Sequence, residues 1–263
     1  MDILRKSMAP ISKEAWEEIN DTAKDVLSSA LSARKIVDVQ GPMGLKYAAL
    51  PVGRIRIPEN QQGNLKYGIH QVLPMVEARI PFKLNIWELD NLARGAEDID
   101  LDALEEAARE IAQFEENVIY EGLADGSIAG LKNSSDYESI PFPEGDEEIL
   151  QAVTRAISRF KMDSIGGPYS LVLSKEKWQR VNSIVKGYPL NKQLEKVLGG
   201  SIIMAPFVKD SYLVSQRGGD CKMVIGQDLA IGYESHDHQS VQLYLTESFT
   251  FQIIEPRAFI VLT

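Results

Sequence analysis

The sequence predicts an α+β fold, because both ends of the chain look β-rich around a long helix, while the middle looks α/β. Apolar and polar residues alternate strictly over 76–86, as they do in a strand with one buried face. Similar β-like runs occupy 241–253 and 258–262 near the end of the chain. Between these regions, apolar residues recur every three or four positions, which is typical of helices that bury one face.

Two long helices are expected in the first half of the chain. The first begins after Ser12, a residue type that favours helix N-termini, and its apolar residues form one narrow stripe up to Ala30. The second runs from Asp100 to about Gly122. Its paired glutamates at 105–106 and 115–116 are interpreted as a solvated face.

The stretch 47–76 predicts a long hairpin with little to bury inside its own chain. Two β-like runs flank the turn-like sequence PENQQGN at 58–64. An isolated two-stranded ribbon is only marginally stable in water. We therefore expect the surface that covers this hairpin to come from another molecule.

Composition limits the classes of function. The 263 residues are 44% hydrophobic and 25% charged, as in a globular protein with a substantial core. A formal charge of −10 opposes nucleic-acid binding over most of the surface. The chain has one cysteine, no apolar run long enough to span a bilayer and no signal-peptide pattern at its start. These features predict a cytoplasmic protein, made without processing, that binds neither nucleic acid nor membrane.

Motifs for catalysis are missing. The sequence has no Gly-Lys dipeptide for a phosphate-binding loop and no GxSxG elbow. His236 and His238 could place two imidazoles on one face of a strand, but a solvated turn fits their polar surroundings better. Cys221 has no visible base that would generate a thiolate. We therefore expect no catalytic residue, no metal site and no cofactor.

Several long blocks of the sequence, in the right order, resemble the encapsulins, which are bacterial and archaeal shell proteins. The matching blocks are GPMGLKYAALPVGRI, LNIWELDNLARG, FEENVIYEG, IGGPYSLVL, SQRGGDCKMVIGQDLAIGYE and LYLTESFTFQI. The resemblance implies the fold of tailed-phage major capsid proteins, the Hong Kong ninety-seven type, with a peripheral domain, an axial domain and an extended loop. It places the N-terminal helix and the start of the peripheral domain in 1–46, the extended loop in 47–76, the peripheral domain with its long helix in 77–135, the axial domain in 136–220 and the C-terminal peripheral strands in 221–263.

The resemblance also implies a function. Encapsulins form closed icosahedral homo-oligomers around cargo enzymes, commonly ferritin-like proteins or dye-decolourising peroxidases, which dock through C-terminal targeting peptides. By resemblance, the docking residues on the inner wall are Arg34, Ile36, Asp38, Asp228, Leu229 and Ile231, and the loop at the fivefold pore is formed by Lys186, Gly187, Tyr188 and Pro189.

Two alternatives remain open at this point. A phage or prophage major capsid protein would share the fold, although the acidic charge does not suit a container for DNA. A bacteriocin or protease acting in its own right would need an active site, for which the sequence offers no motif.

Overall fold

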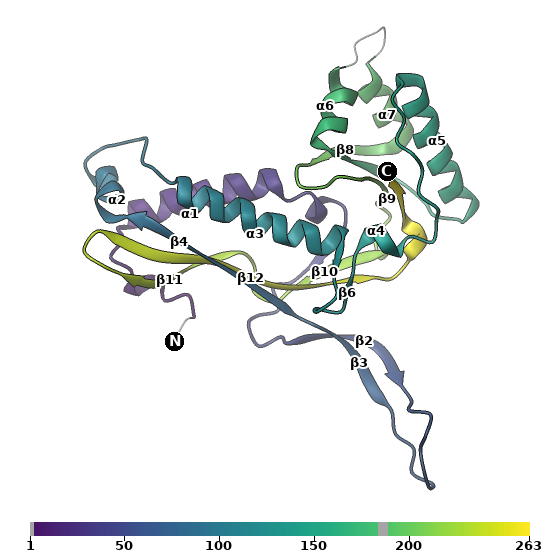
Figure 1. The fold of residues 1–263 in the computed structure, drawn as a ribbon, viewed down its shortest axis with the longest axis horizontal. Helices are drawn as coiled ribbons and strands as arrows, with labels where there is room; N and C mark the ends of the chain where they lie inside the picture. The colour runs from purple at the N-terminus through teal and green to yellow at the C-terminus, as the bar shows by residue number, and fades with distance from the viewer. Residues whose placement is uncertain (1–2, 184–188) are drawn as a thin grey trace.

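The computed structural model describes residues 3–183 and 189–263. Two long helices lie side by side over one face of a five-stranded sheet, and a smaller lobe sits beyond one end of that sheet (Figure 1). The main lobe contains α1 (Lys13–Ala30), α2 (Ile86–Ala93), α3 (Asp102–Tyr120), β1 (Asp38–Gln40), β4 (Val76–Asn85), β10 (Cys221–Ile225), β11 (Ala230–His236) and β12 (Ser240–Ile253), with the 3₁₀ turns η1 (Lys6–Met8) and η2 (Ala33–Lys35) on either side of α1.

Helix α1 forms for the reasons visible in the sequence. The Ser12 hydroxyl oxygen accepts a hydrogen bond from the Ala15 backbone N–H at 3.1 Å and caps the first turn. The buried stripe from Ala15 to Ala30 packs against α3 and the sheet. The predicted first helix is confirmed.

Strand β12 organises the main sheet. Strands β10 and β11 pair antiparallel with its two halves, and β4 runs antiparallel along it from Ser240↔Asn85 to Phe249↔Val76. Among the described strands, β4 pairs only with β12, so β4 is an edge strand. This agrees with the presence of Pro81 within it, because proline is confined to sheet edges and bulges.

The smaller lobe is built on a four-stranded sheet in the order β13-β9-β7-β8. Its central strands are buried throughout, and helices pack around them. It contains α5 (Asp146–Met162), β7 (Tyr169–Ser174), α6 (Lys175–Ser183), α7 (Leu190–Leu198), β8 (Gly199–Ala205), β9 (Ser211–Ser215) and β13 (Phe259–Leu262). Short elements join the lobes: β5 (Gly122–Leu123), β6 (Ile128–Ala129), α4 (Leu131–Ser134) and η3 (Pro256–Ala258).

The last strand departs from the expected division of the chain. Residues 221–263 were expected to belong together with the main sheet, but β13 pairs antiparallel with β9 in the smaller lobe. Its four residues are all buried. A short run that is apolar on both faces suits either sheet, so its periodicity could not show which sheet it joins.

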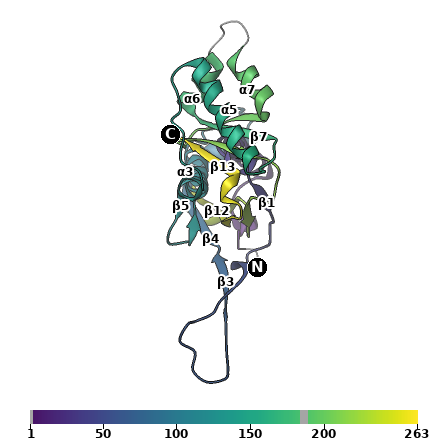
Figure 2. The same cartoon turned by 90° about the vertical axis from the view of Figure 1, so that its right-hand side faces the viewer.

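The predicted hairpin is present and projects from the body. Of the strands that the structure describes, β2 (Ala49–Arg56) and β3 (Ile69–Pro74) pair only with each other, and they extend well beyond the main sheet (Figures 1 and 2). Apolar side chains along it are exposed: Ile55, Ile57, Leu65, Tyr67, Ile69 and Val72. Within 3–183 and 189–263, no helix has the length and hydropathy needed to cross a membrane.

Candidate functional site

A cavity of about 570 Å³ lies between α1 and the strands β11 and β12. Its apolar lining comes from helix residues such as Leu27 and from Leu229, Ile231 and Leu245 on the opposite side. Charged side chains complete its wall: Lys6, Lys24, Arg34, Lys35 and Asp228. An apolar surface bordered by charged groups suits a short peptide segment, because burial supplies affinity and charges fix orientation.

Four of the six predicted docking residues meet at this cavity. Arg34, Asp228, Leu229 and Ile231 all line it, although they are far apart in the sequence. Ile36 does not line it, since its side chain is buried in the core shared by the two lobes.

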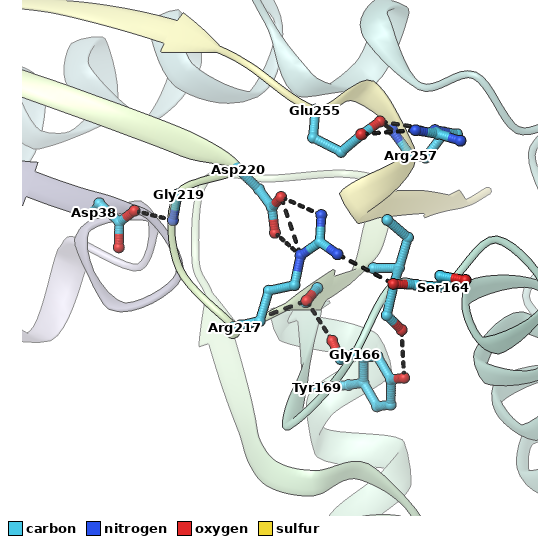
Figure 3. A network of polar contacts seen from close by, with 11 residues as sticks. Asp38, Ser164, Gly166, Tyr169, Arg217, Gly219, Asp220, Glu255 and Arg257 are labelled. Atoms are coloured by element: carbon cyan, nitrogen blue, oxygen red, sulfur yellow. Dashed lines mark hydrogen bonds and ion pairs between the residues drawn. The ribbon is translucent and has the colours of Figure 1, made fainter.

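Asp38 is also separate from the cavity. Its Oδ2 accepts a hydrogen bond from the Gly219 backbone N–H at 2.6 Å, so it points at the turn before β10 (Figure 3). In that turn, the Arg217 guanidinium pairs with Asp220 and donates to the Ser164 carbonyl at 3.2 Å. The contacts tie main-lobe strand β1 to the turn and the turn to the smaller lobe, which is a structural role.

The predicted pore loop falls largely outside the described residues. Lys186, Gly187 and Tyr188 belong to the part of the chain that the structure does not describe. Pro189 is described and directly precedes α7.

An ionic cluster whose two glutamates are buried lies at one end of the cavity. Arg34 Nε and Nη2 donate to the Glu115 carboxylate at 2.6–3.0 Å, and Arg34 Nη1 donates to Asp228 Oδ1 at 2.9 Å. The same Nη2 contacts Glu247 Oε2 at 3.3 Å. Burial and the Glu115 charge raise the pKa of Glu247 well above its ordinary value. The contacts within the Arg34 cluster (Arg34, Glu115, Asp228 and Glu247) therefore hold the side chains of Arg34 and Asp228 in place at the cavity.

The neighbouring Glu116 holds the chain between α1 and η2. Its Oε1 accepts from the backbone N–H groups of Ser32 and Ala33 at 2.8 and 2.7 Å, and its Oε2 accepts from the Ser32 hydroxyl. Burial raises the pKa of Glu116 to about 7, against the lowering effect of those hydrogen bonds.

Glu116→Gln is expected to remove one pH dependence of stability. In the native state, the Glu116 carboxyl keeps its proton to a higher pH than it does in the unfolded chain. The protonated carboxyl therefore contributes fully to the free energy of unfolding below the unfolded-state pKa of 4.5, and this contribution is lost as pH rises through about 7. Glutamine keeps the accepting oxygen and cannot ionise. Between about pH 5 and about pH 8, thermal unfolding should show the wild type losing on the order of 2 kcal/mol relative to the variant. Glu110→Gln, at an exposed position on the same helix, should follow the wild type; a constant difference between Glu116→Gln and wild type would contradict the assignment.

The interpretation of the glutamates at 115–116 as a solvated face is wrong. Both side chains are fully buried. They continue the i+4 spacing of Ile111 and Ala112, so α3 is buried on a wider face here than near its start. This spacing was the signal in the sequence that could have revealed their burial. Arg34, which follows α1, is the partner of Glu115.

The residues considered for chemistry have ordinary surroundings. Burial raises the pKa of Cys221 to about 12, so the group is a thiol near neutral pH. The Tyr233 hydroxyl and His236 Nδ1 lie 2.6 Å apart. Asp237 accepts backbone hydrogen bonds from Gln239 and Ser240, which hold its pKa well below the usual range.

Two lobes, a projecting hairpin and a long helix over a β-sheet define the fold of tailed-phage major capsid proteins. A virus-like particle from Pyrococcus furiosus has this fold, with a TM-score of 0.68 at 16% identity over 95% of this chain and 100% of that one. The capsid protein of Myoviridae phage XM1 gives a TM-score of 0.53 at 12% identity, covering 86% of this chain and 89% of that one.

The sequence comparisons identify the family within that fold. Residues 1–250 match the family model described as "Encapsulating protein for peroxidase". The Type 1 encapsulin shell protein of Mycolicibacterium paratuberculosis is 35% identical over 264 residues, which cover 100% of both chains. The chain belongs to the encapsulin shell protein family.

Proposed function

We propose that this chain is the structural subunit of a closed icosahedral shell that encloses cargo enzymes in the cytoplasm. The projecting hairpin carries this proposal. Its exposed apolar side chains include Ile57 and Leu65, which are 68% and 76% exposed in the single chain. A two-stranded ribbon with such a surface needs another molecule to cover it. A second copy of the same chain can supply that surface at every subunit, and a closed assembly leaves no ribbon uncovered.

The cavity between α1 and β11 is the proposed docking site for the C-terminal targeting peptide of a cargo protein. Leu27, Leu229 and Ile231 offer apolar contact, while Arg34 and Asp228 present opposite charges at one end. A short peptide could bury apolar side chains in the cavity and orient its polar groups against those charges. Suitable cargo classes are ferritin-like proteins and dye-decolourising peroxidases, which the family commonly encloses.

Docking can be tested with a fluorescent reporter that carries the C-terminal segment of a ferritin-like protein from the same source. Leu229→Ser combined with Lys24→Ala should lower reporter co-purification about tenfold or more, because one apolar contact and one charge of the cavity are lost. Assembly should be unchanged, since both positions lie on the cavity wall.

Asp38→Ala is the matched control for this experiment. Asp38 binds the 217–220 turn outside the cavity, so its loss should leave reporter loading near the wild-type level. A cavity variant that loads as well as wild type, or a loss confined to Asp38→Ala, would overturn the proposed docking site.

The loop containing Lys186, Gly187, Tyr188 and Pro189 is proposed to line the fivefold pore and to admit ions and small molecules. This proposal rests on the family resemblance; of these residues the structure describes Pro189, which directly precedes α7 in the smaller lobe (Figure 1). We also propose that the shell has no catalytic activity of its own. Purified shell without cargo should show no peptidase or oxidase turnover that depends on one of its residues.

A further inference from the structure

The Arg34 cluster contains more carboxyl groups than its single guanidinium can neutralise. Glu115 comes from α3, Glu247 from β12 and Asp228 from the turn before β11, and all three contact Arg34. The side chains of Glu115 and Glu247 are 0% and 1% exposed. Glu116 adds a fourth carboxyl beside Glu115. Ionising every member would leave a large uncompensated negative charge in a buried place, which is strongly unfavourable.

Glu247 is the member with the poorest contacts for a charged carboxylate. Its Oε2 has the longest contact with the guanidinium, at 3.3 Å, and its buried Oε1 has no donor among the described residues. Glu115 and Glu247 nevertheless meet at one nitrogen, because Arg34 Nη2 donates to both carboxyl groups. One guanidinium cannot neutralise two buried carboxylates while it also pairs with Asp228, so the buried pair is expected to keep one proton.

One atom of the cluster is also hydrogen-bonded to the backbone of the cavity wall. Asp228 Oδ1 accepts from Arg34 Nη1 and also from the Leu229 backbone N–H at 2.8 Å. Asp228 is the solvent-accessible member of the cluster, with 48% of its side chain exposed. It is therefore the carboxylate that can most easily leave Arg34, and its departure would release the N–H of Leu229 in the cavity wall.

We infer that Glu247 and Glu115 share one proton, and that Glu247 is a positioning residue whose protonation holds Arg34, Asp228 and Leu229 in the docking conformation. Loss of the proton puts a second buried negative charge on Arg34. The guanidinium is drawn toward Glu115 and Glu247, its contact with Asp228 is released, and the cavity wall at 228–231 loosens. The consequence for cargo, though not the shared proton, rests on the proposed docking function.

The direction of the pH effect follows from the surroundings of Glu247. Burial, then the charge of Glu115, raises the pKa of Glu247 well above 4.5, with Arg34 opposing this and Asp228 adding to it. A contribution from a raised native-state pKa is complete below the unfolded value and is lost as pH rises through the native value. The cavity wall should therefore be ordered under acidic conditions and loosen on the alkaline side.

The test uses Glu247→Gln in assembled full-length protein. The amide can donate to Glu115 and accept from Arg34, but it cannot lose a proton. Amide hydrogen exchange at Leu229 should accelerate about tenfold per pH unit in wild type, beyond the ordinary base-catalysed increase, once the shared proton begins to dissociate. The variant should show only the ordinary increase. Glu110→Gln, on the exposed face of α3, should match wild type.

A spectroscopic readout separates this role from simple packing. In a Glu116→Gln background, the protein should show a protonated carboxylic-acid carbonyl band in the infrared at a pH where an ordinary glutamate is ionised, and adding Glu247→Gln should remove it. If Glu247→Gln does not assemble, Glu115→Gln makes the same test, because removing either charge removes the repulsion. Identical exchange in wild type and variant, or no protonated carboxyl band, would overturn the inference.

The fluorescent reporter then tests the link to cargo. Wild-type particles should release the docked reporter more readily as pH rises, and Glu247→Gln particles should retain it. A reporter that fails to load at any pH contradicts the proposed docking site without affecting the exchange and infrared results. A reporter released equally from both proteins contradicts the link between the shared proton and docking.

Discussion

Replacing residues 52–71 with an Asn-Gly turn is expected to abolish closed particles and leave a folded subunit or small oligomers. The replacement removes the exposed apolar side chains of the hairpin except Val72, and it keeps the buried Leu50. Asn-Gly favours the tight turn that can join the remaining strand ends. Because the removed part pairs only with itself, its loss should not disturb the two cores.

Circular dichroism, light scattering and negative-stain electron microscopy of the purified variant would check this result. A milder variant, Leu65→Ser with Tyr67→Ser, keeps the hairpin and removes two of its exposed apolar side chains. It should assemble less completely than wild type. Particles of normal size and yield from the deletion variant would show that the hairpin is not the principal contact between subunits.

Arg34→Ala is expected to be the most destabilising single substitution in the docking region. It should lower the free energy of unfolding by about 3–5 kcal/mol, because it leaves buried carboxyls without their cation. The loss should grow as pH rises, since Glu247 and Glu116 have raised pKa values and can be neutral under acidic conditions. Thermal unfolding of wild type and variant over a pH series measures this difference.

A triple variant controls for lost packing around Arg34. Arg34→Met with Glu115→Leu and Glu247→Leu replaces the ionic group by apolar side chains, which is often neutral for stability. It should recover much of the stability lost in Arg34→Ala while lacking the charge that orients cargo. Equal destabilisation of the single and triple variants at every pH would show that charge is not the cause.

Periodicity in the sequence predicted the elements that bury one face and expose the other. The stripe of α1, the alternation of β4 and the uncovered hairpin each follow from burial on one face. β13 lacks this property because both of its faces are buried, and its sheet depends on contacts with β9 that only the folded chain shows. The prediction for the glutamates at 115–116 was wrong for a related reason. Charged residues usually face solvent, and the residues that bind these two glutamates lie 81 residues or more away in the sequence.

The candidate site was predicted in part. Arg34, Asp228, Leu229 and Ile231 meet at one cavity, whereas Ile36 and Asp38 are neighbours in sequence that face other parts of the molecule. The 3₁₀ turn at 33–35 gives way to strand β1 at Asp38, so Arg34, Ile36 and Asp38 do not share one face. Glu247 gave no signal, because nothing in a β-strand pattern distinguishes a buried carboxyl from one that faces solvent.

Electron microscopy of the chain expressed alone, together with light scattering in solution, tests the central claim most directly. The proposed function predicts uniform, hollow, closed particles in which the hairpin of each subunit is covered by a neighbouring copy. A monodisperse monomer, dimer or other small oligomer of the intact chain would contradict it.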